Sequence, residues 1–202
     1  MSDFTQSAFE GSLLSAIVYN DQIEARMNDD AFRNALADEL SEAEIDYFLG
    51  NFEIVDTTDF TRDWYDLHEL ADSGYQGMLV KRKGSDDNGE PDEFWFVNRG
   101  TEADIFDPED LAKDLFIADL DLALTGKASF QIAAMEKYFQ SLIDSGAIPP
   151  SATLYAAGHS LGGHLNTYLA DAHELLIDHA FTYNGAGIDK LPDSPSELEN
   201  FL

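Results

Sequence analysis

The sequence predicts an α/β fold, in which a mixed sheet with parallel core strands is flanked by helices and preceded by an N-terminal helical segment. Apolar residues recur at helical spacing through residues 1–51, and short β-rich runs alternate with further helical stretches over 52–202. The heptapeptide AGHSLGG at 157–163 follows an apolar, strand-like run. We expect a single domain over 1–202, in which the N-terminal helices are a scaffold without a chemical role.

The chain is strongly acidic, with 40 Asp and Glu against 11 Lys and Arg and a formal net charge of −29. Nucleic acid is therefore not expected as a partner, because phosphate binding requires a basic surface. A hydrophobic content of 44% still predicts a folded core. We interpret the acidity as a solubility feature, with a saline habitat or a calcium-rich exterior as alternatives.

Several kinds of site are excluded by what the sequence lacks. There are no cysteines, so neither a disulfide nor a thiolate metal site can form. No run approaches the ~18 apolar residues of a membrane-spanning helix, and the N-terminus has no signal-peptide pattern. The acidic stretch at 84–92 does not have EF-hand spacing and is expected to be a solvated turn. We expect no cofactor, no metal and no transmembrane segment.

Three helices are predicted in the N-terminal segment. The first covers 5–19, with Thr5 as a candidate N-cap, and the second covers 22–40. The third opens with Ser41 and Glu44, which fit a capping box, and ends near residue 50.

Five β-rich runs follow, at residues 52–57, 75–83, 93–99, 151–158 and 180–187. Asn88-Gly89, between the second and third runs, is a hairpin signal. The third and fourth runs are separated by an acidic helical stretch and by a second helix over about 128–144. A strand–helix–strand crossover predicts a parallel pair with a right-handed connection. A further helix is expected from Ser160 to about Leu176.

The pattern G-x-S-x-G, between a strand and a helix, predicts a nucleophile elbow. Gly158 and Gly162 would leave room where the strand and the helix cross. Ser160 would then take a strained backbone conformation with its Oγ at the carboxyl edge of the sheet. The N–H of Leu161 would point toward an oxyanion formed beside the serine. The alternative is a glycine-rich turn with an incidental serine.

The end of the third β-rich run supports the interpretation of 158–162 as a nucleophile elbow. Residues 98–101, Asn-Arg-Gly-Thr, end a strand that should lie parallel to and near the elbow strand. A glycine and a hydroxyl residue at such a position can supply an N–H and an O–H to a developing oxyanion. The alternative is a simple strand exit.

Together these stretches resemble the class 3 lipases, a family with the α/β-hydrolase fold. The matching stretches are FVNRGTE (96–102), AAGHSLGGHLNTYLA (156–170) and FTYNGAGI (181–188). The resemblance extends over residues 52–188 and implies an α/β-hydrolase-like fold with Ser160 as the acyl nucleophile. It also implies that the backbone N–H groups of Thr101 and Leu161 form the oxyanion hole, with the Thr101 hydroxyl as a further donor. The chain departs from the family at Asn98, where a phenylalanine is usual, and this change could alter the pocket wall.

None of the five histidines is expected to act as the catalytic base. The fold orders its triad as serine, acid, histidine. His159 is adjacent to the serine and cannot face it, whereas His164 and His173 are predicted on the helix that follows. His179 would stand at the opposite edge of the sheet. His68 precedes the serine and is therefore out of order.

The acid of a triad is also not evident. Asp189 follows the last predicted strand, but the family places its acid after one further strand, so we interpret Asp189 as a loop residue. We expect the acid and the base beyond residue 202, in a longer hydrolase of which this chain is the N-terminal part.

The favoured function is a serine ester hydrolase acting on lipid esters, of the triacylglycerol lipase or phospholipase A type, with an acyl-enzyme on Ser160. A non-catalytic, degenerate hydrolase module within a larger secreted protein is one alternative. Another acyl hydrolase, such as a thioesterase or a peptidase, is a second. The acidic, cysteine-free composition also resembles secreted bacterial lipases and phospholipases with C-terminal calcium repeats, so we expect secretion, with a cytoplasmic location as the alternative.

Overall fold

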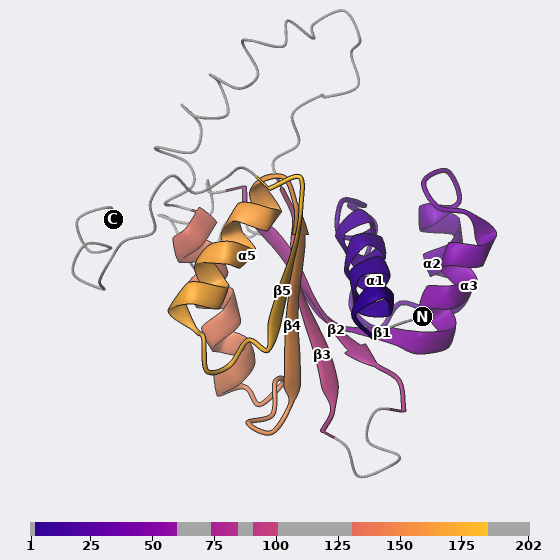
Figure 1. Cartoon of the computed structure of the whole chain (residues 1–202). Helices are drawn as coiled ribbons and strands as arrows, with labels where there is room; N and C mark the ends of the chain where they lie inside the picture. Colours follow the sequence, from indigo (N-terminus) through magenta and orange to yellow (C-terminus); the bar gives the residue numbers. More distant parts are fainter. Residues whose placement is uncertain (1–2, 60–73, 85–90, 101–130, 186–202) are drawn as a thin grey trace, which may run out of the picture.

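The computed structural model describes residues 3–59, 74–84, 91–100 and 131–185 (Figure 1). In these ranges five strands form one sheet in the order β1-β2-β3-β4-β5. β1 pairs antiparallel with β2 and β2 with β3, whereas β3, β4 and β5 are parallel. The predicted mixed sheet with a parallel core is therefore confirmed. The strands are β1 (Phe52–Asp59), β2 (Gln76–Arg82), β3 (Glu93–Asn98), β4 (Thr153–His159) and β5 (His179–Tyr183).

The register of the parallel strands brings their carboxyl ends to one edge of the sheet. Asn98 at the end of β3 lies beside Gly158 of β4, which in turn lies beside Thr182 of β5. The parallel pairing predicted for the crossover is confirmed, and the helix over 131–144 lies between β3 and β4 in the chain. The predicted hairpin pairing of β2 with β3 is also confirmed. Its Asn88-Gly89 turn lies outside the described residues.

Three N-terminal helices are present, α1 (Asp3–Ile17), α2 (Asp29–Leu36) and α3 (Glu42–Asn51). The capping box of α3 is confirmed, since the Ser41 side chain accepts a hydrogen bond from Glu44 N, and the Glu44 carboxylate accepts one from Ser41 N at 2.8 Å. A reciprocal cap of this kind satisfies two backbone donors that the first turn would otherwise leave unpaired.

Several predicted helix and strand ends were wrong. Thr5 is not the N-cap of the first helix, because α1 already includes Asp3. The second helix is shorter than predicted: the Asn28 side chain accepts a hydrogen bond from Ala31 N at 3.0 Å and so starts α2 there. Near the C-terminus, α5 (Leu161–Ala172) ends before Leu176. β5 likewise ends at residue 183 and not at 187.

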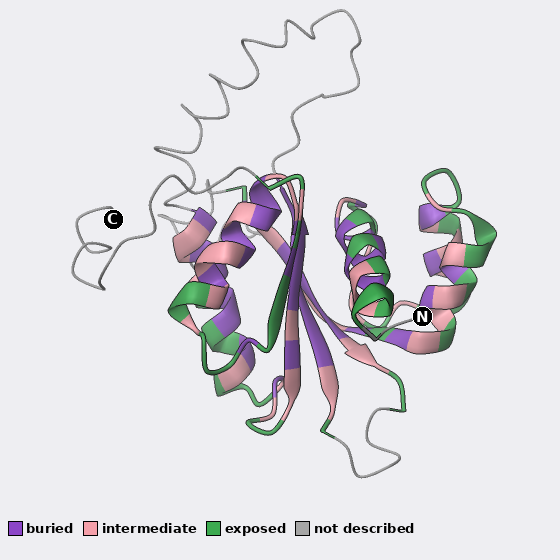
Figure 2. Cartoon of the chain, viewed as in Figure 1, coloured by how far each residue is buried: buried purple, intermediate pink, exposed green. Residues whose placement is uncertain are grey.

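The sheet separates two helical layers. α1, α2 and α3 cover one face, and α5 with the helix over 131–144 covers the other, as Figure 1 shows. Side chains alternate along β3, so Trp95 and Val97 enter the core under the N-terminal helices while Phe94 and Phe96 enter the core under α5. β3 is buried on both faces over most of its length (Figure 2). β3 is also the middle strand of the five, so its carboxyl end lies between those of its two neighbours.

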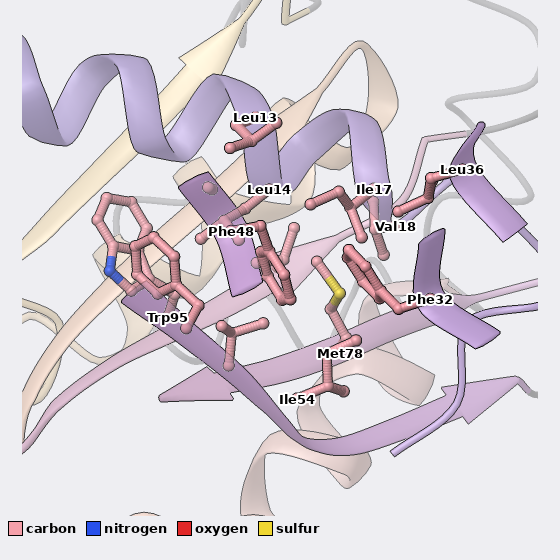
Figure 3. Packing of buried hydrophobic residues seen from close by; sticks show 14 of the residues in the cluster. Leu13, Leu14, Ile17, Val18, Phe32, Leu36, Phe48, Ile54, Met78 and Trp95 are labelled. Atoms are coloured by element: carbon pink, nitrogen blue, oxygen red, sulfur yellow. The ribbon is translucent and has the colours of Figure 1, made fainter. Parts of the chain in front are cut away.

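The core under the N-terminal helices is held by stacked aromatic rings (Figure 3). The rings of Phe32 and Phe48 are 4.5 Å apart and nearly parallel, and that of Phe52 lies 5.8 Å from Phe48. α2, α3 and β1 are thereby joined through one buried ring. In the described parts of the chain, no helix has the length and apolar character needed to cross a membrane.

Replacement of Phe48 by alanine should therefore destabilise the protein strongly. Phe48 is 2% exposed, and removal of a buried phenylalanine ring costs about 3–5 kcal/mol in free energy of unfolding. Urea unfolding followed by circular dichroism measures the change. Phe4→Ala is the matched control, because Phe4 is 70% exposed and should lose much less stability. Equal losses in the two variants would contradict the packing described here.

Candidate active site

Ser160 connects β4 to α5 in the backbone conformation predicted for a nucleophile elbow. Its φ is 55° and its ψ is −122°, values that a residue with a Cβ atom adopts only when its surroundings enforce them. Ser160 N donates to Tyr183 O at 2.9 Å, and Ser160 O accepts from Gly163 N at 3.0 Å. The peptide groups on both sides of the serine are therefore fixed. Its side chain does not cap α5 and is left for other contacts.

The two glycines of the motif allow a backbone approach that no other residue would permit. A Cβ atom on Gly158 would lie 2.5 Å from the backbone of Gly162, and one on Gly162 would lie 2.2 Å from the carbonyl oxygen of Asn98. Both distances are far below van der Waals contact, and in both the obstacle is backbone. The sequence-based interpretation of these glycines is confirmed.

The exit of β3 lies directly beside the elbow, as the sequence predicts. A Cβ atom on Gly100 would lie 2.7 Å from His159 O and 3.3 Å from Leu161 N. Leu161 is the first residue of α5, so the helix contains no carbonyl for its N–H. That N–H is the candidate oxyanion donor. Thr101, the other predicted donor, lies outside the described residues.

Two of the three histidines on or next to α5 and β5 contact other side chains. His173 Nε2 lies 2.8 Å from Glu136 Oε2 at the far end of α5. His179 begins β5 and stacks on Tyr155, at the opposite edge of the sheet from the serine. Burial lowers the pKa of His164 and favours its neutral form. His173 and His179 thus lie in contacts away from the serine, whereas His164 Nδ1 is buried without a hydrogen-bond partner among the described residues.

His159 also does not face the serine hydroxyl. Its Nδ1 lies 3.5 Å from Tyr19 Oη and its Nε2 lies 3.5 Å from Asn184 Nδ2. Among the described residues, no hydrogen bond joins the Ser160 hydroxyl to any histidine. His68 and Asp189, considered above as base and acid, lie outside the described residues.

A buried polar chain lies beneath the elbow, and sequence reasoning missed it. Tyr75 Oη donates to Asn98 Oδ1 at 2.5 Å, and Asn98 Nδ2 donates to Asn166 Oδ1 at 2.5 Å. Asn98 and Asn166 are completely buried, and burial raises the pKa of Tyr75 well above its ordinary value. The chain joins the residue that precedes β2 to β3 and α5. Asn98, where class 3 lipases usually have phenylalanine, is thus an internal link between the strand and the helix.

A cavity of about 480 Å³ opens between the N-terminal segment and the β1–β2 pair. Asp21, Glu24 and Thr57 supply polar groups to its wall, and Ile23 and Met78 supply apolar ones. Ser160 does not line it, so the described part of this cavity is not the candidate reaction site. In the same described ranges, no cluster of three or more histidine, aspartate or glutamate side chains is arranged to hold a metal ion.

No family model matches the chain, and no curated protein matches it either. Lip2 lipase from Yarrowia lipolytica is similar in structure, with a TM-score of 0.53 at 14% identity over 92% of this chain and 59% of that one. A lipase from Rhizopus microsporus var. chinensis has a TM-score of 0.47 at 11% identity, over 92% of this chain and 58% of that one. Lipase II from Rhizopus niveus has a TM-score of 0.44 at 14% identity, over 98% of this chain and 69% of that one.

The likeness to Lip2 lipase confirms the predicted α/β-hydrolase-like fold. This chain spans about three fifths of the length of the first two of these lipases. At such low identity the comparison concerns the fold alone, and the chemistry must be argued from this chain's own residues.

Gly158→Ala and Gly162→Ala should each destabilise the protein, because the added methyl group would meet backbone that cannot rotate away. Overpacking of this kind costs about 1–3 kcal/mol. The matched control is Gly50→Ala, since Gly50 is in α3 and has no atom within 4 Å of an added Cβ. That change should be neutral or should stabilise by up to about 1 kcal/mol. Thermal unfolding of the three variants measures the difference, and elbow variants as stable as Gly50→Ala would contradict the crossing geometry.

Proposed function

We propose that this protein is a serine hydrolase that cleaves carboxylic esters through an acyl-enzyme on Ser160. The observation that carries the proposal is the backbone of Ser160, held at positive φ between a strand and a helix. Strain of this kind persists where the surrounding structure enforces it, and it is concentrated at functional sites. The conformation places the serine at the sheet edge, with Leu161 N–H at the start of the following helix.

The reaction follows from these groups. Ser160 Oγ attacks the ester carbonyl carbon while its proton passes to a general base, and the carbonyl oxygen becomes an oxyanion that the Leu161 N–H stabilises. The tetrahedral intermediate then expels the alcohol, which takes up the proton, and leaves an acyl-serine. Attack by water on the acyl-serine releases the acid and restores the hydroxyl. Thr101 is proposed as the second oxyanion donor.

Lipid esters are the proposed substrate class. Support comes from the fold shared with Lip2 lipase and from the motif resemblance to class 3 lipases over residues 52–188. The base is proposed to come from outside the described residues, because no hydrogen bond joins the Ser160 hydroxyl to any histidine within them. The same observation favours a second candidate, a non-catalytic hydrolase module in which the elbow is retained without its base.

Covalent labelling distinguishes the two candidates. An alkyl fluorophosphonate should react at Ser160, forming a phosphorus–oxygen bond with loss of fluoride, and the adduct should be located by mass spectrometry of the peptide. Ser160→Ala should abolish labelling, and Ser141→Ala should not, because Ser141 is exposed and its hydroxyl bonds to Tyr138 O. Adducts on other serines, with none on Ser160, would contradict the elbow as a nucleophile.

The pH dependence of labelling tests where the base lies. General-base help is worth about 10²–10⁴ in rate. Without a base the serine hydroxyl ionises only through hydroxide, so the labelling rate of the 202-residue chain should rise about tenfold per pH unit between pH 6 and 9. A rate that instead levels near pH 7 would indicate a histidine base within these residues. If His68→Ala then removed the plateau, the base would be His68, contrary to the expectation from chain order.

A further inference from the structure

The candidate site has two halves, the exit of β3 at Gly100 and the elbow at His159 and Ser160. Tyr19, from the N-terminal segment, lies between them. It lies two residues beyond the end of α1, in a turn where Tyr19 N donates to Ala16 O at 3.2 Å. α1 packs against β3, β4 and β5. The half-buried tyrosine side chain thereby reaches the carboxyl edge of the parallel strands.

The tyrosine hydroxyl contacts both halves. It accepts a hydrogen bond from Gly100 N at 3.2 Å, and Gly100 directly precedes Thr101. On the other side it lies 3.4 Å from His159 O and 3.5 Å from His159 Nδ1, and His159 directly precedes Ser160. The one hydroxyl therefore cross-links the exit of β3 to the elbow, 81 and 140 residues away in the sequence.

The fit around this hydroxyl is tight. A Cβ atom on Gly100 would lie 2.4 Å from Tyr19 Oη, so the loop backbone can rest on the hydroxyl only because residue 100 is glycine. The ring itself is held on both sides. The Arg99 guanidinium lies 5.4 Å from the ring centroid, and the imidazole of His159 meets the ring at a steep angle, with centroids 6.2 Å apart.

The geometry points to Tyr19 as a positioning residue for the oxyanion hole, an inference that rests on the proposed function. Its hydroxyl accepts a hydrogen bond from Gly100 N–H and so fixes that peptide against the elbow. By holding that peptide against the elbow, the hydroxyl keeps the exit of β3 packed beside Leu161 N–H, the oxyanion donor proposed above. Oxyanion donors act only when they are held about 2.7–3.1 Å from the developing charge. Loosening the exit of β3 should therefore slow attack by the serine without weakening binding of the reagent.

Tyr19→Phe tests the inference, because it removes the hydroxyl and keeps the ring. Labelling of Ser160 by the fluorophosphonate is measured over a range of reagent concentrations. We expect the maximal labelling rate to fall about tenfold, with the reagent's half-saturation concentration unchanged. Tyr47→Phe is the matched control: its hydroxyl donates to Glu10 on the far side of α1, and its loss should leave labelling within twofold of wild type.

Amide hydrogen exchange supplies a second readout that does not depend on reactivity. In Tyr19→Phe the Gly100 amide should exchange at least about tenfold faster than in wild type, since its acceptor is gone. If Tyr19→Phe does not unfold cooperatively, 3-fluorotyrosine is placed at position 19 instead. This analogue keeps the hydroxyl and weakens it as a hydrogen-bond acceptor. It should change the labelling rate and the exchange rate in the same direction as Tyr19→Phe.

The outcomes separate the two claims. A wild-type chain that is not labelled at Ser160 overturns the proposed function, and with it the role of Tyr19 in the reaction. If the wild type is labelled and Tyr19→Phe is labelled equally fast, the inference about Tyr19 alone is overturned. An equal loss of labelling in Tyr47→Phe would assign the effect to general stability and would also overturn it.

Discussion

The contact between the start of α5 and the end of β3 is the constraint on which the site depends. The position of a Cβ on Gly162 is 2.2 Å from Asn98 O, so backbone lies against backbone where the helix crosses the sheet. A helix that starts this close to β4 must turn within one residue, and Ser160 takes the positive φ that the turn requires. The position of the serine hydroxyl is thus a consequence of glycines on either side of it, and the helix start supplies its N–H as part of the same geometry.

Close backbone packing leaves the side chains beneath it buried, so their polar groups must find hydrogen-bond partners within the protein. Asn98 and Asn166 are completely buried, and a buried amide without a partner costs about 1–3 kcal/mol. They bond to each other, and Tyr75 bonds to Asn98, whereas Asn166 Nδ2 has no hydrogen-bond partner among the described residues. An apolar residue at position 98 would fill this space without needing a polar partner. The polar chain instead ties the helix carrying the elbow to two strands through directional bonds, which fix the helix position more narrowly than apolar contact does.

Local patterns in the sequence predicted much of this arrangement. The spacing of glycines around Ser160 predicted the elbow, and Ser41 with Glu44 predicted the start of α3, because each depends on residues within one turn of the chain. Helix ends without a unique signal were less certain, and Asn28 capped α2 later than apolar periodicity indicated. The alternation of strands and helices also predicted the parallel core.

The remaining features could not be predicted because they join residues far apart in the sequence. Asn98 and Asn166 are 68 positions apart, and neither belongs to a pattern that identifies the other. Tyr19 lies just beyond the end of α1, and its contacts with Gly100 and His159 arise from the docking of α1 on the sheet. Such contacts depend on the strand register and on the angle at which α1 packs on the sheet. Neither can be inferred from local patterns in the sequence.

The few cations of this acidic chain explain how the N-terminal helices come to take part in the site. Arg82 of β2 bridges Glu10 of α1 and Glu93 of β3, and Arg99 bonds Asp21 at 2.6 Å just beyond α1. With a net charge of −29, general repulsion opposes compaction, and it is screened by salt more than these partly buried pairs are. The two arginines therefore anchor the N-terminal segment at both ends of β3. The segment expected to be a scaffold alone is thereby held where Tyr19 reaches the elbow.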